Sequence, residues 1–127
     1  MMRWLLEDFA KANLRLEEAL ALPADSDVVK AGCIQYFEFC FELAWKASKA
    51  ALEEHGLIDC ASPKSCLRQA FAQGWINDET IWLEMLEARN RMSHTYDAAR
   101  ALEIFQALPR FLPALKGLQE CLESLQS

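Results

Sequence analysis

Apolar residues recur every three or four positions along most of the chain, which is the spacing of one face of an α-helix. The pattern predicts five helices, which run from about Arg3 to Leu20, from about Asp27 to His55, from Pro63 to near Gly74, from Asn77 or Asp78 into residues 89–96, and from Asp97 to about Leu125. Ser26 or Asp27, Ser62 and Asp97 are suited to cap the helices that follow them. Pro109 and Pro113 are predicted to kink or divide the last helix near its middle.

The middle of the second predicted helix, Ile34–Trp45, is apolar on nearly every side. A helix of this kind is typical of the buried centre of a bundle. We therefore expect its aromatic residues to form core rather than a platform for stacking bases: Phe37, Phe39, Phe41 and Trp45. At about 100° per residue, Glu38, Glu42 and Lys46 form a single polar line along the same helix.

Composition agrees with a helical protein. The 127 residues are 53% hydrophobic and 25% charged, with only four glycines and four prolines, which favours one folded domain over residues 1–127. The predicted fold class is all-α, an antiparallel four-helix up-and-down bundle with an additional short helix. No apolar run approaches the roughly 20 residues that span a bilayer, and acidic residues follow Met1 too closely for a signal peptide. The expected location is the cytoplasm.

Cysteine and histidine usage gives no sign of a metal centre. The five cysteines include no C-x-x-C pair, and Cys33 and Cys40 are expected to be small core residues. The two histidines, His55 and His94, lie in unrelated surroundings, so we predict neither a zinc site nor a cofactor. The net charge of −6 means that any RNA ligand must be held by local arginines against an unfavourable overall field.

A strongly polar stretch follows directly after the fourth predicted helix. If the helix continues, Arg89, Ser93 and Tyr96 lie nearly in line, and Asn90 and His94 form a second line about 100° away. Arg89 can hold a phosphate with two parallel hydrogen bonds, and His94 can act as a general base or acid on RNA. The spacing alone also fits an ordinary polar helix end with no catalytic role.

The remaining polar residues of this stretch have supporting roles in the catalytic interpretation. Asn90 can fix the imidazole or contact the phosphate, and the Tyr96 hydroxyl can donate a hydrogen bond or accept a nucleotidyl group. None of these roles requires a metal ion. Glu38 and Glu42 are interpreted as structural, one of them balancing Arg89 or Arg91 inside the bundle or at a subunit contact.

Two segments resemble the signatures of a known family, the nucleotidyltransferase substrate-binding proteins of the HEPN superfamily. Phe37–Lys46 is similar to the signature of the family's second helix, Trp82–Asp97 to its other signature, and Ser62-Pro63 lies between them as in the family. Cys40 stands where relatives often have threonine.

The superfamily motif is an arginine, a polar residue and a later histidine, which Arg89, Asn90 and His94 match. Tyr96 matches the tyrosine found in members that are encoded beside a minimal nucleotidyltransferase. Arg91 adds a second basic group to this pattern.

The resemblance implies a helical homodimer in which the motifs of two subunits face one cleft. Active members are metal-independent RNases that act as toxins, and their partner nucleotidyltransferase neutralises them by transferring AMP to the motif tyrosine. An alternative is a non-catalytic subunit that binds a nucleotide or substrate for the nucleotidyltransferase, and a third is a structural dimer with a vestigial site. The chain has no phosphate-binding loop followed by paired aspartates, so it is not itself expected to be a nucleotidyltransferase.

Overall fold

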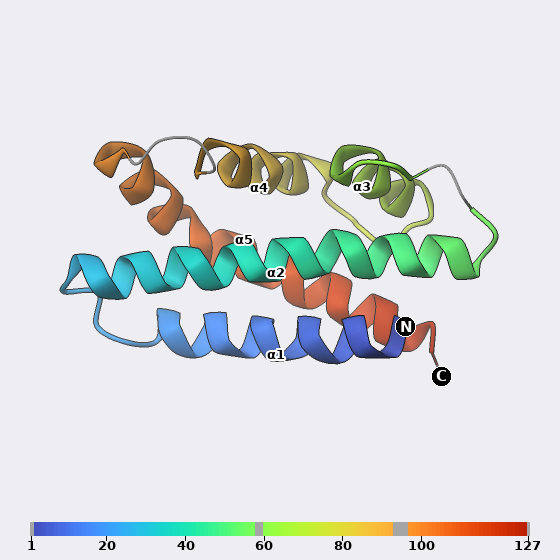
Figure 1. Cartoon of the computed structure of the whole chain (residues 1–127), viewed down its shortest axis with the longest axis horizontal. Helices are drawn as coiled ribbons and strands as arrows, with labels where there is room; N and C mark the ends of the chain where they lie inside the picture. Colours follow the sequence, from blue (N-terminus) through green and yellow to red (C-terminus); the bar gives the residue numbers. More distant parts are fainter. Residues whose placement is uncertain (1, 58–59, 93–96, 127) are drawn as a thin grey trace.

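The computed structural model describes residues 2–57, 60–92 and 97–126 (Figure 1). These residues form five helices: α1 (Met2–Leu20), α2 (Asp27–Glu54), α3 (Pro63–Ala72), α4 (Glu79–Met92) and α5 (Ala98–Ser124). The described residues contain no strand. The predicted all-α bundle with one short additional helix is therefore confirmed.

Helix α2 is the centre of the bundle and packs against each of the other four helices. Helix α1 runs antiparallel to α2 along one side, α3 and α4 lie on the other side, and α5 crosses behind (Figure 1). The side chains of Phe37, Phe41, Ala44 and Ala47 are completely buried on α2. Among the described helices, α1 contacts α2 and α5, whereas α4 contacts α2, α3 and α5.

The predicted caps set the starts of three helices. The Ser26 hydroxyl accepts a hydrogen bond from the backbone N–H of Val29 at 3.2 Å, and Ser62 forms a reciprocal capping box with Ser65. The Asp97 carboxylate accepts hydrogen bonds from the first turn of α5. Each cap supplies an acceptor for an N–H group that has no partner within its helix.

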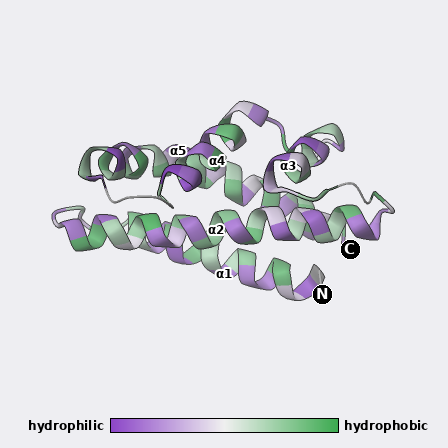
Figure 2. Cartoon of the chain, turned by 45° about the horizontal axis from the view of Figure 1, so that its top comes forward, coloured by the Kyte–Doolittle hydropathy of each residue, from purple (hydrophilic) through white to green (hydrophobic). Residues whose placement is uncertain are grey.

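The aromatic residues of α2 are only partly core, which corrects the sequence prediction. Phe37 and Phe41 are buried, whereas the Phe39 side chain is 49% exposed and Tyr36 is 37% exposed. These two exposed rings pack edge to face, with centroids 6.5 Å apart. Figure 2 shows that the outer side of α2 carries hydrophobic as well as hydrophilic residues. The four neighbouring helices do not cover the side of α2 that carries Tyr36 and Phe39. Residue composition alone could not identify which side of the helix would be left exposed.

The two prolines do not divide α5, so the prediction of a break was wrong, and the alternative of a kink stays a prediction. Pro109 and Pro113 lie within one continuous helix, and both are exposed. Each proline removes one backbone hydrogen bond, but on the solvent side the released carbonyl can bind water instead. The buried side chains of Leu108, Phe111 and Leu115 continue the core face across both prolines and hold the helix together.

Two of the cysteines are buried free thiols, and two others form a disulfide. Cys33 and Cys40 are buried as predicted, and burial raises the pKa of the Cys40 thiol to about 12, which keeps it protonated and unreactive. Cys60 and Cys66 form a disulfide, with Cα atoms 4.8 Å apart, which joins the α2–α3 connection to α3. The sequence offered no motif that signals this pair.

Candidate functional site

An ion pair between Arg89 on α4 and Glu42 on α2 is the centre of the site. The Arg89 Nη2 atom donates to Glu42 Oε1, and its Nη1 atom donates to Asn90 Oδ1 at 3.2 Å. The other Glu42 oxygen accepts a hydrogen bond from Trp45 Nε1 at 3.1 Å and lies 3.9 Å from Lys46 Nζ. Glu42 thus has donors from two helices, which fixes the direction in which the guanidinium points.

The Arg89–Glu42 pair is partly shielded from water, since the two side chains are 31% and 32% exposed. Partial desolvation strengthens the attraction relative to that of a surface pair. The sequence interpretation expected one of two glutamates to balance an arginine, and the structure gives this role to Glu42. Trp45 was interpreted only as core, although its spacing of three residues from Glu42 was a signal for the hydrogen bond it makes.

Arg91 takes no part in that pair. Its guanidinium is hydrogen-bonded to Glu87 one turn earlier on α4, and both side chains are exposed. Glu38 lies one turn before Glu42 on α2. Burial raises the pKa of the Glu38 carboxyl; the attraction of Arg89 lowers it and the repulsion of Glu42 raises it.

The raised pKa of Glu38 predicts how replacing it changes stability with pH. In the unfolded chain Glu38 ionises near its ordinary value of 4.5, but in the folded protein it ionises at a higher pH. Between these two values the folded state binds more protons, so the free energy of unfolding falls as the pH rises through this window. Glu38→Gln should therefore gain stability relative to the wild type as the pH is raised above 4.5.

Urea denaturation at a series of pH values measures this difference. Glu53→Gln is the matched control, because Glu53 is an exposed glutamate on the same helix. A stability difference for Glu38→Gln that is constant with pH would contradict the prediction.

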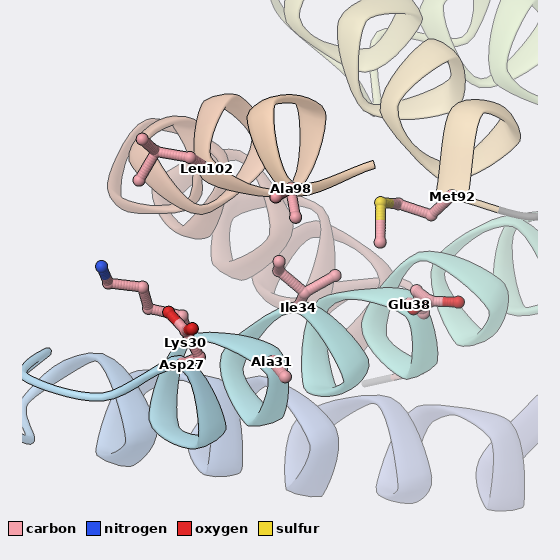
Figure 3. Close-up of a pocket in the computed structure, with 9 residues that line it drawn as sticks. Asp27, Lys30, Ala31, Ile34, Glu38, Met92, Ala98 and Leu102 are labelled. Carbon is pink, nitrogen blue, oxygen red and sulfur yellow. The ribbon is translucent and has the colours of Figure 1, made fainter. Parts of the chain in front are cut away.

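A cavity of about 370 Å³ lies between the first half of α2, the end of α4 and the start of α5. We call it the α2–α5 cavity (Figure 3). Its lining is mostly aliphatic, with two carboxylates and one ammonium group: Asp27, Lys30, Ala31, Ile34, Glu38, Met92, Ala98, Ala101 and Leu102.

The cavity is lined by residues that flank, in sequence, the segment of residues 93–96, which includes the predicted catalytic residue His94. Ser93, His94 and Tyr96 lie outside the described residues, so their side chains are not placed. Met92 and Ala98, which come just before and just after that segment, both line the cavity. Chain connectivity therefore brings both ends of the segment to this part of the molecule.

A shallow groove on the α3–α4–α5 side concentrates positive charge. We call it the basic groove, and its lining residues are Lys64, Leu83, Leu86, Glu87, Asn90, Arg91 and Arg100. Three cations outnumber one carboxylate here, on a chain whose net charge is −6. Asn90 connects the groove to Arg89, to which its side chain is hydrogen-bonded. Arg91 is paired with Glu87 and Arg100 lies 3.9 Å from Asp97, so a polyanion would compete with these carboxylates for two of the three cations.

Two kinds of feature are absent from the described part of the chain. Within residues 2–57, 60–92 and 97–126, no three histidine, cysteine, aspartate or glutamate side chains are grouped so that they could hold a metal ion. No helix in this part of the chain is both long enough and apolar enough to cross a membrane.

The fold and site define a class: small helical bundles in which an arginine at the end of one helix is held by a glutamate of the central helix. The chain belongs to the family described as nucleotidyltransferase substrate binding protein like, whose model matches residues 5–124. A Haemophilus influenzae protein named "Probable ribonuclease HepT" is 36% identical over 90 residues. That match covers 68% of this chain and 62% of the relative, so somewhat less than two thirds of the relative's length is represented.

Two solved structures share the fold. A Thermus thermophilus protein is 34% identical, with a TM-score of 0.82 over 90% of this chain and 98% of its own. A Haemophilus influenzae protein, described as revealing the fold of a substrate binding domain of a nucleotidyltransferase, is 30% identical. Its TM-score is 0.85, and the match covers 93% of this chain and 98% of that protein.

Proposed function

We propose that this protein is the helical partner of a minimal nucleotidyltransferase and acts as a metal-independent endoribonuclease, the toxin of a toxin–antitoxin pair. The observation that carries the proposal is the Arg89–Glu42 pair beside Asn90, at the end of α4. It holds a guanidinium ready for a phosphate immediately before the segment that contains His94. The name of the Haemophilus relative, a ribonuclease, supports the same activity.

The proposed reaction needs only the RNA's own 2′-hydroxyl as nucleophile. His94 accepts the proton of that hydroxyl as the oxygen attacks the adjacent phosphorus, and Arg89 stabilises the negative charge that develops on the phosphate. The bond to the 5′-oxygen breaks, and this oxygen leaves as it receives a proton. The products are a 2′,3′-cyclic phosphate and a 5′-hydroxyl end. We also propose that the protein is a homodimer in which two such motifs face one cleft, as the family resemblance implies, so the second His94 can supply that proton.

Incubation of the purified protein with single-stranded RNA in the presence of EDTA tests this activity. We expect cleavage that leaves 5′-hydroxyl ends and is unaffected by EDTA. Loss of cleavage with EDTA, or 5′-phosphate ends, would contradict the proposed chemistry.

The basic groove predicts where RNA is held. Lys64→Glu and Arg100→Glu should each weaken RNA binding and lower the salt dependence of the affinity by about one unit of slope, because each removes a phosphate contact. Fluorescence anisotropy with labelled RNA at several salt concentrations measures both effects. Lys11→Glu is the control, since Lys11 is exposed on α1, which has no contact with α3 or α4. Equal losses of RNA affinity in all three variants would mean that binding depends on the net charge of the protein and not on the basic groove.

Neutralisation by the partner predicts a covalent change. Incubation with the nucleotidyltransferase and ATP should raise the intact mass of the protein by whole AMP units, and Tyr96→Phe should abolish the increase. Tyr36→Phe is the matched control, because Tyr36 is the only other tyrosine and its ring is 37% exposed. An unchanged mass increase in Tyr96→Phe would exclude Tyr96 as the acceptor.

A second candidate function is a non-catalytic subunit that binds the nucleotide or substrate of a two-component nucleotidyltransferase. The description of the Haemophilus structure favours it. It predicts tight association with a nucleotidyltransferase and no RNA cleavage by the helical protein alone. The EDTA cleavage assay therefore separates the two functions.

A further inference from the structure

We propose that the α2–α5 cavity binds the base of the RNA nucleotide next to the cleaved phosphate and favours bases that carry an exocyclic amino group. This inference rests on the proposed function, because RNA is the substrate named there. It assigns the cavity a ligand and gives Glu38 the role of selecting the base.

The size and walls of the cavity fit a single base. Its volume of about 370 Å³ lies at the small end of the range of ~300–1,000 Å³ typical of small-molecule sites. Figure 3 shows Met92 reaching from α4 toward Ile34 on α2, with Ala98 of α5 on the same side. Apolar walls of this kind suit the flat faces of a base, and single-stranded RNA is recognised mainly through bases that have left the stack.

Glu38 supplies the polar group that would select the base. A carboxylate accepts hydrogen bonds from the amino groups of adenine, cytosine and guanine. The edge of uracil instead presents a single N–H donor between two carbonyl oxygens, and these oxygens repel a carboxylate. Glu38 is also close enough to Arg89 for the two charges to interact, so a base held by Glu38 lies near the phosphate that Arg89 is proposed to bind.

Lys30 lies toward the opposite end of the cavity. It is eight residues before Glu38 on the same helix, a separation of about 12 Å along the axis. Its ammonium group is suited to a second phosphate of the same RNA strand. The pocket thus has one carboxylate near Arg89 and, at its far end, the Lys30 ammonium group together with the Asp27 carboxylate.

The binding test uses NMR of protein carrying labelled alanine methyl groups, which requires no catalysis. The methyl signals of Ala31, Ala98 and Ala101 are followed during titration with AMP, CMP, GMP, UMP and ribose 5-phosphate. We expect the three nucleotides with amino groups to bind about tenfold more tightly than UMP. Ribose 5-phosphate should leave these signals unchanged. Equal affinity for UMP, or equal shifts with ribose 5-phosphate, would overturn the proposal.

Two variants locate the binding within the cavity. Ala98→Trp places a large side chain in the cavity and should abolish the shifts of Ala31 and Ala101. Ala99→Trp is its matched control, because Ala99 is the next exposed alanine of α5 and does not line the cavity. Glu38→Gln, whose amide both donates and accepts, should bring the affinity for UMP to within about threefold of that for AMP. Binding that survives in Ala98→Trp, or discrimination that survives in Glu38→Gln, would contradict this assignment.

Comparison of a short RNA with a free nucleotide identifies the source of the base. A uridine pentamer with one central adenosine should bind more tightly than AMP and more tightly than ATP. Preference for ATP would show that the cavity serves a free nucleotide and would overturn the RNA assignment. Base binding without RNA cleavage would refute only the proposed nuclease, whereas cleavage without base binding would refute only this inference.

Discussion

His94→Ala should reduce the rate of RNA cleavage by a factor of about 10²–10⁴, because this is the contribution that a positioned general acid or base usually makes. The binding of uncleaved RNA should change little, since the basic groove and Arg89 remain. Rates are measured with excess enzyme in a single turnover, in the presence of EDTA.

The chain offers a matched control in its other histidine. His55 is at the C-terminal end of α2, where its Nδ1 atom lies 2.8 Å from the carbonyl oxygen of Ala51 and its ring packs edge-on against Trp75. The α2–α5 cavity is lined by residues from the first half of the same helix. His55→Ala should therefore leave the cleavage rate near that of the wild type. Similar rates for His94→Ala and the wild type would remove His94 from the mechanism.

Phe37→Ala should lower the free energy of unfolding by about 3–5 kcal/mol, the usual cost of emptying a fully buried aromatic position. The Phe37 ring is completely buried and stacks on Phe111 of α5, with centroids 5.4 Å apart. It also packs against Phe41, at 6.3 Å between centroids. The measurement is urea denaturation followed by circular dichroism.

Phe39→Ala is the matched comparison on the same helix. Because the Phe39 side chain is 49% exposed, its removal should cost about 1 kcal/mol or less. Equal losses of stability in the two variants would mean that the outer face of α2 is covered after all, as it would be if a second subunit packed there. Repeating the denaturation at several protein concentrations separates these cases, because only the stability of an assembly depends on concentration.

The contrast between Phe37 and Phe39 also illustrates what sequence reasoning could not decide. The apolar middle of α2 correctly predicted the central helix of a bundle. It did not predict the exposed stripe of Tyr36 and Phe39, because this stretch is apolar on nearly every side and its one polar line, Glu38, Glu42 and Lys46, does not include them. The continuity of α5 through Pro109 and Pro113 was missed for a related reason, since the cost of a proline depends on whether the released carbonyl faces water or core.

Local sequence determined the helices and the chemistry of the candidate site. The spacing of apolar residues predicted the helices, and the side chains of Ser26, Ser62 and Asp97 provided the caps, because these interactions join residues only a few positions apart. The Arg89–Tyr96 motif and its resemblance to a known family pointed to RNA and to a nucleotidyltransferase partner.

Only the tertiary structure decided how distant groups meet. It selected Glu42 rather than Glu38 as the partner of Arg89, 47 positions away, and left Glu38 to line a cavity. It also gathered Lys64, Arg91 and Arg100 from three helices into one groove on an acidic protein. Such contacts depend on the rotation and crossing of whole helices, which the packing of all their buried side chains sets together and which no local pattern specifies.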